Sequence, residues 1–276
     1  MSNAGSRVVR RSSRTLTGLV IFLLFAIPLA YVVMISLESS HHFLSNPLKP
    51  PTHAAFENFG TAWRDANLAT EIVNTVIYSV ISAVLSTVLS MFIAVPVARS
   101  MVRWSRLWYT FVVVGVFLPF AAIPLFVESQ YLHLYNNRIG YILLHIETGM
   151  PLGVILITAF MFSVPKEIDE AAWLDGAGYF RYLRSVVVPL IWPSLLITFL
   201  YALLGVWNDI IGPVVFLADP DLFPVTRGIF NFYGQNESAW TVLAAAVILV
   251  SLPVVVLFGF TQRHLMHATT GAAVKA

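Results

Sequence analysis

Apolar residues are gathered in six long stretches of this chain, and polar residues collect between them. The stretches lie at about 16–37, 72–98, 108–127, 139–162, 186–211 and 239–262. A helix needs about 20 mostly apolar residues to cross a bilayer. Each stretch has roughly that length, so the pattern predicts an all-α integral membrane protein with six transmembrane helices.

Composition supports this prediction and excludes several other classes. Of 276 residues, 58% are hydrophobic and 11% are charged, and the mean hydropathy is +0.80. A soluble domain carries about 25% charged residues, and a disordered chain is poor in apolar ones. The net charge of +2, without a dense basic tract, argues against nucleic-acid binding. The lack of cysteine excludes disulfides, thiolate catalysis and cysteine-ligated metal sites.

The first apolar stretch follows four arginines between residues 7 and 14, which is the order found in a signal peptide. A signal peptide has an apolar core of only about 7–15 residues and then a small-residue cleavage site. This run continues to Leu37, and Glu38-Ser39-Ser40-His41 is not such a site. We therefore predict an uncleaved first span.

The distribution of Lys and Arg predicts the orientation. Twelve of these residues lie in the two tails and the loops after the second and fourth spans, and four lie on the opposite side. Because positive charge is retained in the cytoplasm, both termini are predicted to be cytoplasmic. The outer loop contains Asn46-Pro47 and Pro50-Pro51, which resist regular helix. The predicted division is an N-tail (1–15), a first span (16–37), an extracytoplasmic loop (38–71), a membrane core (72–262) with a cytoplasmic loop (163–185), and a C-tail (263–276).

Common catalytic and nucleotide-binding motifs are missing. None of the three lysines ends a G-x-x-x-x-G-K-[ST] loop, so the chain has no P-loop of its own. It also has no H-E-x-x-H and no G-x-S-x-G sequence. The adjacent His41 and His42 point apart on a helix or a strand, which disfavours a metal pair. We expect no catalytic residue, cofactor or metal in this chain, and an energy source in another protein or an ion gradient.

Three ionisable residues fall inside apolar stretches: His145, Glu147 and Asp209. Buried charge is costly in a membrane and is usually kept for function. Gly149 and Pro151 can open the fourth helix and line a wet cavity. Alternatively, this is a break near the outer interface. Two other functions stay open here: a secondary transporter driven by an ion gradient through Glu147, and a membrane-embedded enzyme using His145 and Glu147.

The segment 163–193 predicts a helix on the cytoplasmic side. Ser163 and Pro165 suit its start, the acidic residues 167, 169 and 170 suit its positive end, and Gly176 and Gly178 suit its stop. The pattern predicts about three turns, then a turn, then a second helix that enters the fifth span.

One side of this helix is predicted to contact another protein. Ile168, Ala171, Ala172 and Asp175 are spaced i, i+3, i+4 and i+7, so they share a face. The small alanines permit close approach, and Glu167 and Glu170 offer carboxylates to a basic partner. A helix lying on lipid instead favours Lys and Arg on its polar face. The acidic character therefore favours a protein partner.

The same segment resembles the cytoplasmic EAA loop of binding-protein-dependent ABC importer permeases. The family pattern is E-A-A, three residues, G, nine residues and then I-x-L-P. This chain has Glu170-Ala171-Ala172, three residues, Gly176, nine residues and then Val186-Val187-Val188-Pro189. The spacing is kept, with Val in place of Ile and Leu, and Asp175 before the glycine also fits.

Other segments extend the resemblance to the shorter, second permease subunit of the maltose and multiple-sugar type. Phe56-Glu57-Asn58-Phe59 with Trp63 resembles its outer-loop L-E-N-Y…W, and Asn74-Thr75 its N-[ST]. Trp207-Asn208-Asp209 resembles its W-N-[DE], and Gln262-Arg263 with the tail 271–275 its Q-R…G-A-V-K-G ending. Ala276 in place of the last glycine and the His145/Glu147 pair depart from the pattern.

The resemblance implies a type I ABC importer permease fold in a bacterial inner membrane. It also implies ATP-driven import of a sugar or sugar-like solute that an extracytoplasmic binding protein delivers. The implied partners are that binding protein, a second homologous permease, and two ATPase subunits that bind ATP and Mg. No cofactor is implied in this chain.

The resemblance also implies residue roles. The residues expected to couple to the ATPase are Glu167, Glu170, Ala171, Ala172, Asp175, Gly176, Gly178 and Pro189. Those expected to contact it from the C-tail are Gln262, Gly271 and Lys275. Candidates for the translocation path are Asn74, Glu147 and Asn208.

Overall fold

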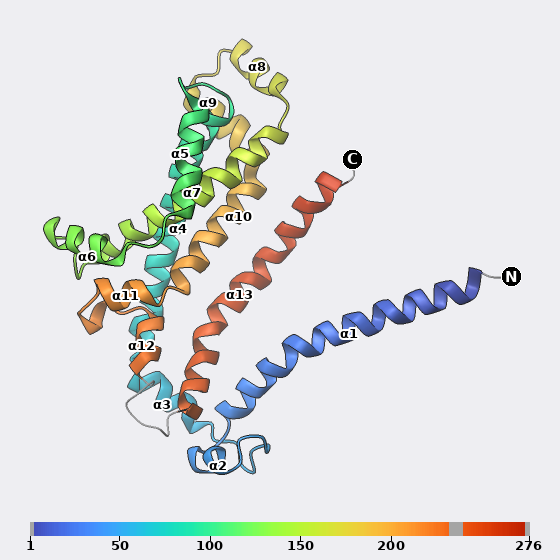
Figure 1. Cartoon of the computed structure of the whole chain (residues 1–276), viewed down its shortest axis with the longest axis vertical. Helices are drawn as coiled ribbons and strands as arrows, with labels where there is room; N and C mark the ends of the chain where they lie inside the picture. The colour runs from blue at the N-terminus through green and yellow to red at the C-terminus, as the bar shows by residue number, and fades with distance from the viewer. Residues whose placement is uncertain (1–2, 232–239, 274–276) are drawn as a thin grey trace. The chain divides into compact units, whose positions relative to one another are not determined.

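The computed structural model of the chain is helical, and no strand occurs in its described part (Figure 1). The structure describes the backbone of residues 3–231 and 240–273 and the side chains of 16–229 and 240–262. The longer helices are α1 (Asn3–Ser36), α3 (Glu57–Asp65), α4 (Leu68–Ala98), α5 (Ser105–Phe117), α6 (Ala122–Tyr131), α7 (Arg138–Ser163), α8 (Lys166–Leu174), α10 (Val188–Trp207) and α13 (Trp240–Ala273). The shorter elements are α2 (Ser40–Ser45), α9 (Tyr179–Tyr182), a π-helical segment (Leu183–Val187), α11 (Ile211–Phe216), a 3-10 turn (Pro220–Leu222) and α12 (Val225–Asn231).

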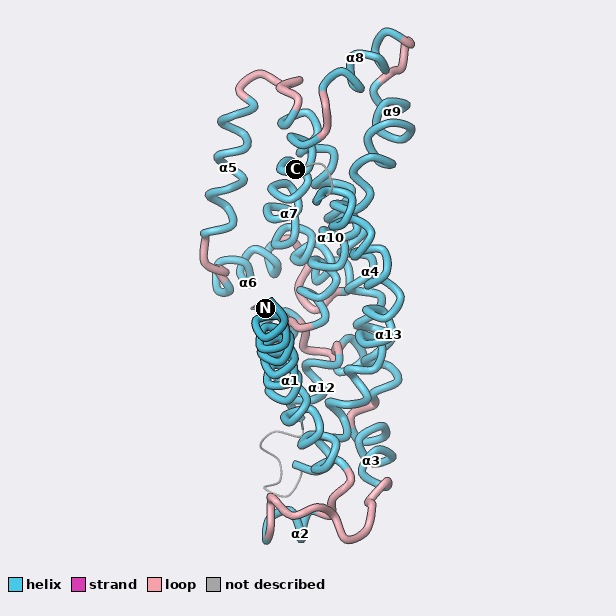
Figure 2. The backbone as a smooth tube through the Cα atoms, turned by 90° about the vertical axis from the view of Figure 1, so that its right-hand side faces the viewer, coloured by secondary structure: helices cyan, strands magenta, loops and turns pink. Residues whose placement is uncertain are grey.

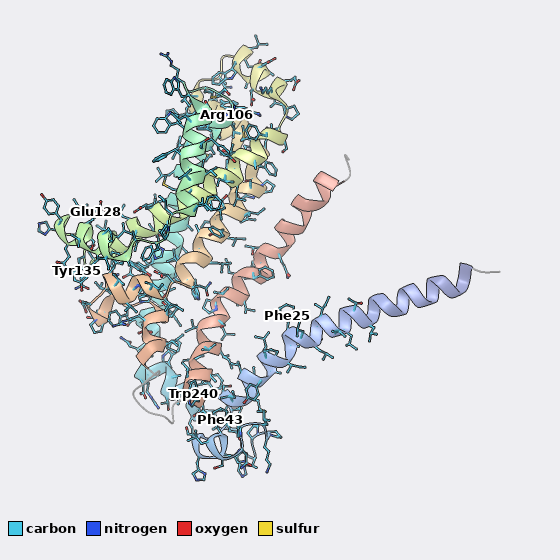
Figure 3. The ribbon with its side chains drawn as sticks, in the orientation of Figure 1. Phe25, Phe43, Arg106, Glu128, Tyr135 and Trp240 are labelled. Atoms are coloured by element: carbon cyan, nitrogen blue, oxygen red, sulfur yellow. The ribbon has the colours of Figure 1, made fainter. Side chains whose placement is uncertain are left out.

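Within the described residues, five helices are long and apolar enough to cross a membrane. They are Leu16–Ser36, Leu68–Ala98, Arg138–Ser163, Tyr179–Trp207 and Trp240–Gln262. On α1 the apolar side chains point outward, and Phe25 is 67% exposed (Figure 3). Lipid tails are as apolar as these side chains, so this exposure fits a helix in a bilayer.

The third predicted span is bent. The sequence pattern predicts one helix over 108–127, but α5 and α6 meet at an angle of 108°. The chain leaves helix at residues 118–121, where Pro119 lacks an amide hydrogen and disfavours helix in the residue before it. The prediction of a continuous helix is wrong, and the count reaches six only if the bent pair is one span.

Other boundaries also differ from the predictions. The outer loop 38–71 holds α2 and α3, which lie on either side of its prolines rather than containing them. Helix α4 begins at Leu68 instead of 72, and α10 ends at Trp207 instead of 211. Helix α7 runs unbroken through Gly149 and Pro151, so the predicted opening does not occur. Neighbouring helices make proline tolerable inside a membrane helix.

The described chain forms two compact units. Unit 1 comprises Met1–Leu68 and Ile229–Pro253. Inside it, the buried Asn58 amide of α3 donates to the carbonyls of Ser36 and Glu38, at 2.9 and 2.8 Å. These bonds satisfy carbonyls at the end of α1, which have no partner within the helix. Asn58, part of the outer-loop motif, therefore fixes α3 to the end of the first span.

Unit 2 comprises Ala69–Gly228 and Val254–Ala276, and α4, α7 and α10 form its core (Figure 2). The contact between α4 and α7 is made by small residues. Gly149 and Gly153 of α7 face Ser86 and Ser90 of α4, and Ser90 Oγ donates to the Met150 carbonyl at 3.2 Å. Small residues let membrane helices approach closely and bond across the contact. This packing fixes the helices that carry both candidate sites described next.

Candidate functional site

Helix α8 forms the projecting end of unit 2, next to α9 (Figure 1). It is nine residues long, shorter than the three turns expected. Gly176 ends it with a φ of +69°, a left-handed conformation that glycine adopts at little cost. The amides of Gly176 and Ala177 donate to the carbonyls of Trp173 and Ala172 at 3.0 and 3.1 Å, which is the Schellman pattern. The glycine therefore stops α8 and turns the chain toward α9.

The two sides of α8 differ from the expected arrangement. Asp169 is 7% exposed and Ala172 is buried in the core of unit 2, so this side faces the chain itself. The prediction that Ala172 contacts a partner is wrong, because the protein's own helices cover it. The exposed residues Glu167, Glu170, Ala171 and Leu174 are spaced i, i+3, i+4 and i+7 and form what we call the outward face of α8.

The other residues of the coupling set follow α8. Asp175 is its exposed C-cap. Gly178 is the N-cap of α9, with a φ of −70°, so its backbone does not require glycine. Pro189 lies in the first turn of α10, beyond the π-helical segment. The structure therefore places Asp175 and Gly178 on the connection between α8 and α9 and Pro189 in α10, and none of the three belongs to the outward face.

A buried charge cluster on the inner side of α8 was missed by the sequence analysis. Arg99 Nε lies 2.6 Å from Asp169 Oδ2, and the Tyr182 hydroxyl donates to Asp169 Oδ1 at 2.7 Å. The sequence signal was present, since Arg99 directly follows an apolar stretch and Asp169 lies in an acidic helix. In the charge count, Arg99 was only an indicator of orientation.

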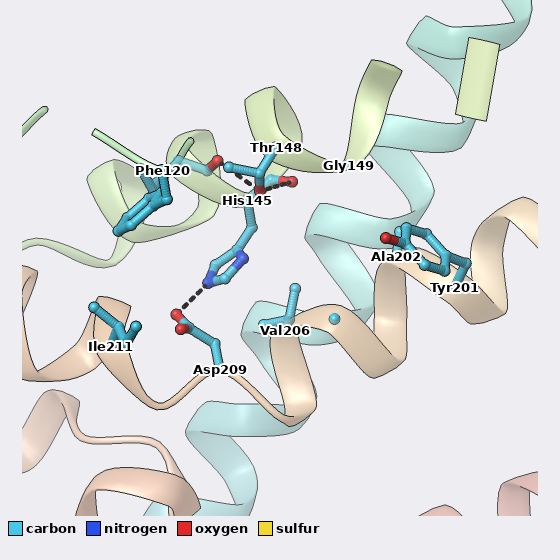
Figure 4. Close-up of a pocket in the computed structure, with 11 residues that line it drawn as sticks. Phe120, His145, Thr148, Gly149, Tyr201, Ala202, Val206, Asp209 and Ile211 are labelled. Atoms are coloured by element: carbon cyan, nitrogen blue, oxygen red, sulfur yellow. Dashed lines mark hydrogen bonds and ion pairs between the residues drawn. The ribbon is translucent and has the colours of Figure 1, made fainter. Parts of the chain in front are cut away.

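A second candidate site is a cavity of about 280 Å³ in unit 2, between α7, α10 and the segment that follows α10 (Figure 4). Its lining residues are Phe120, Leu144, His145, Thr148, Gly149, Tyr201, Ala202, Gly205, Val206, Asp209 and Ile211. Figure 4 shows the His145 ring extending from α7 toward Asp209. Aromatic walls and one polar pair thus meet in a single space.

The carboxylate of Asp209 is held by several donors. The Tyr141 hydroxyl donates to Oδ2 at 2.9 Å, the Gly212 amide donates to Oδ1 at 3.0 Å, and His145 Nε2 lies 3.1 Å from Oδ2. Burial alone would raise the pKa of Asp209, but its contacts with His145, Gly212 and Tyr141 lower that pKa below the usual value. Asp209 lies beyond the end of α10 and presents a stable negative charge to the cavity.

The path candidates from the sequence are not among the residues that line this cavity. Asn74 is buried, and its amide donates to the carbonyls of Asp221 and Phe223 at 2.8 and 3.1 Å. Glu147 is exposed and lines another cavity of about 160 Å³. Asn208 is also exposed, and its amide donates to the Leu204 carbonyl at 2.8 Å. None of these three residues lines the cavity that holds His145 and Asp209, and their role in the path stays a prediction.

Within the described residues, no group of three His, Cys, Asp or Glu side chains could hold a metal ion. Gln262 is exposed and Gly271 lies within α13. Lys275 lies outside the described residues, and the expected tail contacts stay predictions.

Comparison with known proteins identifies the class. Residues 86–269 match the family described as binding-protein-dependent transport system inner membrane component. The diacetylchitobiose uptake system permease protein NgcG of Streptomyces coelicolor is 30% identical over 243 residues, which cover 87% of this chain and 80% of NgcG. The melibiose/raffinose/stachyose import permease protein MelC of Bacillus subtilis is 29% identical, covering 96% of this chain and 99% of MelC. AmyC of Thermoanaerobacterium thermosulfurigenes, a probable permease for starch degradation products, is 28% identical, covering 97% and 98%.

The fold matches a solved transporter. A chain from the crystal structure of a bacterial ABC transporter involved in the import of the acidic polysaccharide alginate superposes with a TM-score of 0.82. The two chains are 21% identical, and the match covers 96% of this chain and 99% of the other. The match confirms the ABC importer permease fold that the sequence resemblance implied. The chain therefore belongs to the inner membrane components of binding-protein-dependent transport systems, as a multi-pass protein of a bacterial inner membrane.

Proposed function

We propose that this chain is a permease subunit of an ATP-driven importer for a sugar or a sugar-like solute. The observation that carries the proposal is the set of relatives, which align over 87% to 97% of this chain and are named for three different groups of carbohydrates. Because the groups differ, the relatives support the solute class rather than one solute.

The cavity beside His145 suits this solute class. Sugars carry hydroxyl groups that both donate and accept hydrogen bonds, and His145 and Asp209 supply an imidazole and a carboxylate. Phe120 and Tyr201 supply aromatic faces for the apolar side of a sugar ring. The volume of 280 Å³ is at the lower limit of typical ligand pockets, about 300 Å³, which suits one ring of a longer solute. We infer that this cavity faces the translocation path.

We further infer that the outward face of α8 docks on a cytoplasmic ATPase subunit. Without a P-loop, this chain needs a partner that binds ATP and Mg. Glu167 and Glu170 are exposed carboxylates for basic groups of that partner. Leu174 is 88% exposed, and a large apolar residue exposed beside charged ones suits a protein interface. This docking requires α8 and both termini to be cytoplasmic.

The remaining partners follow from the importer class. A second homologous permease completes the path, two ATPase subunits supply energy, and an extracytoplasmic binding protein delivers the solute. A second solved structure, with a TM-score of 0.66 and 16% identity, is an alginate ABC transporter in complex with an alginate pentasaccharide-bound periplasmic protein. It supports a binding protein as the delivering partner.

Secondary transport through Glu147 is not favoured. An ion-coupling carboxylate is expected to be buried in the path of the ion. Glu147 is exposed, and it is absent from the lining of the cavity that holds His145 and Asp209. The carboxylate in that cavity is Asp209, and the groups that surround it keep it charged by lowering its pKa.

The decisive experiment measures uptake by proteoliposomes that contain the assembled complex. Labelled melibiose and diacetylchitobiose are the probes, offered with the binding protein. Uptake should require internal ATP, and Glu170→Arg should abolish it, because a positive charge would then meet the basic groups of the ATPase. Glu128→Arg makes the same change at an exposed glutamate of α6 and should leave uptake intact. Uptake without ATP, or normal uptake by Glu170→Arg, would contradict the proposal.

A further inference from the structure

The inner side of α8 is fixed to the rest of unit 2 by three buried side chains. We call Arg99, Asp169 and Tyr182 the Arg99 link. Arg99 directly follows α4, and its side chain is 4% exposed. Its Nε lies 2.6 Å from Asp169, the buried carboxylate of α8, and the Tyr182 hydroxyl at the end of α9 donates to the same carboxylate at 2.7 Å. Both oxygens of Asp169 therefore have partners on other elements.

The same guanidinium also fixes the end of α7. Arg99 Nη1 donates to the Met161 carbonyl at 2.9 Å, and Nη2 donates to the Val164 carbonyl at 3.0 Å. Carbonyls in the last turn of a helix have no partner within the helix. The planar guanidinium fork can reach both of them and the carboxylate at once, which a lysine cannot do. One side chain thus joins α4, α7 and α8.

Apolar packing closes the remaining side of the link. Ala172 and Tyr182 belong to the same buried cluster, which also contains residues of α4, α7 and α10. The Trp173 ring lies 5.0 Å from the Tyr182 ring, centroid to centroid. Consequently, α8 is fixed to the bundle by contacts along its length as well as by the chain at its two ends.

These contacts fix the orientation of α8 and do not only attach it to the bundle. A buried ion pair often gives no more stability than well-packed apolar residues of the same size. The ion pair, the two bonds from Arg99 to backbone carbonyls and the Tyr182 bond, however, form together in only one geometry. If α8 rotates or slides alone, the ion pair and the Tyr182 bond break together. A movement in which α4 and α7 follow α8 keeps these contacts and therefore costs less free energy. Coupling of this kind needs a continuous, stiff set of contacts.

We propose that the Arg99 link is the joint through which a displacement of α8 moves α4 and α7 during import. Arg99, Asp169 and Tyr182 are positioning residues that act through the outward face of α8. The inference rests on the proposed docking of that face on an ATPase, and it adds the route by which the movement enters the membrane helices.

The stiffness of the joint can be measured in the full chain in lipid nanodiscs. The chain has no cysteine, so Leu174→Cys and Phe162→Cys introduce two spin labels without background. Leu174 of α8 is 88% exposed, and Phe162 of α7 is 65% exposed. Pulsed electron paramagnetic resonance should give a narrow distance distribution, and Arg99→Lys should broaden it. Arg103→Lys, the same change at an exposed arginine four residues later, should not. An equally narrow distribution in Arg99→Lys overturns the proposal.

The consequence for import is measured in the assembled complex as solute taken up per ATP hydrolysed. Arg99→Lys should reduce this ratio by about tenfold, and Tyr182→Phe, which removes a single bond, by about twofold. The combined change Arg99→Met and Asp169→Leu leaves no buried charge unpaired, so it should lose less thermal stability than Arg99→Met alone, without restoring the ratio. A ratio that follows thermal stability across these variants would show a purely structural cluster and overturn the proposal.

The measurements separate this inference from the proposed function. Glu170→Arg should abolish uptake and yet leave the distance distribution between the two spin labels narrow, because Glu170 lies on the outward face and not in the Arg99 link. If the native complex imports without ATP, the proposed function fails, and the coupling role fails with it. If the native complex requires ATP and Arg99→Lys keeps the native ratio, only the Arg99 link is refuted.

Discussion

Replacing Gly153 with alanine should destabilise the helix bundle that carries both sites. A Cβ at this position would lie 2.5 Å from Ser90 Oγ, 3.0 Å from Ser90 Cβ and 2.9 Å from Thr198 Cγ2. Ser90 and Thr198 are themselves buried, on α4 and α10, so neither can turn away into open space. The added methyl group must push three helices apart.

The size of the effect follows from two opposing contributions. Inserting a methyl group into a packed core costs about 1–3 kcal/mol, and contacts this short place Gly153 at the upper end. Alanine is a better helix former than glycine by about 1 kcal/mol. The net loss in the free energy of unfolding should therefore be about 2 kcal/mol. The matched control is Gly259→Ala in α13, where a Cβ meets nothing within 4 Å. This control should leave the free energy of unfolding unchanged or raise it by up to about 1 kcal/mol.

Unfolding by sodium dodecyl sulfate in mixed micelles, followed by tryptophan fluorescence, measures these differences. A double-mutant cycle identifies the cause, because Ser90→Gly removes two of the three atoms that crowd this position, Ser90 Oγ and Ser90 Cβ. The combined variant should lose less stability than the two single variants predict by addition. If Gly153→Ala is as stable as Gly259→Ala, or if the two changes simply add, the close packing of α4 on α7 is not what holds this bundle.

Three further variants test other positions. Gly176→Ala should cost about 1–2 kcal/mol, measured by the same unfolding assay, since its φ of +69° is strained for any side chain although a Cβ there would clash with nothing. Tyr141→Phe should cost about 1 kcal/mol and weaken uptake through a higher KM, because Asp209 loses one donor at the cavity. Asn74→Ala should cost about 2 kcal/mol with little change in KM, because it leaves two carbonyls without a donor and lies away from the cavity.

Much of the fold could be predicted from the sequence, because membrane helices are encoded by length and apolarity. The expected span 139–162 became Arg138–Ser163, within one residue at each end. The break between α5 and α6 was missed for the same reason. A count of apolar residues treats Leu118-Pro119 as membrane-spanning, whereas the local preference of a residue before proline opposes helix.

The cavity could not be predicted from local sequence patterns, because it is formed by residues that are far apart in the chain. His145 and Asp209 were each noticed as ionisable residues in apolar stretches, but 64 positions separate them in the chain. Their contact exists because α7 and α10 pack against each other. Helix α10 ends at Trp207, so Asp209 lies outside the helix and its carboxylate can point toward His145. Asn74 illustrates the opposite case. Its polarity at the start of a span suggested the path, yet its bonds to the segment 221–223 fix the protein's own loop.

The orientation of α8 explains why a motif can be recognised while its contacts are misassigned. Ala171 and Ala172 are equivalent by size, and the 3.6-residue period allows two faces that differ by one position. What decides between them is the pairing of Asp169 with Arg99, a residue 70 positions earlier in the chain. Once that carboxylate is fixed inward, Ala172 must be buried with it, and Glu170 and Ala171 must face out. Within one E-A-A sequence, the first two residues are thus available to a partner and the third is committed to the protein's own core.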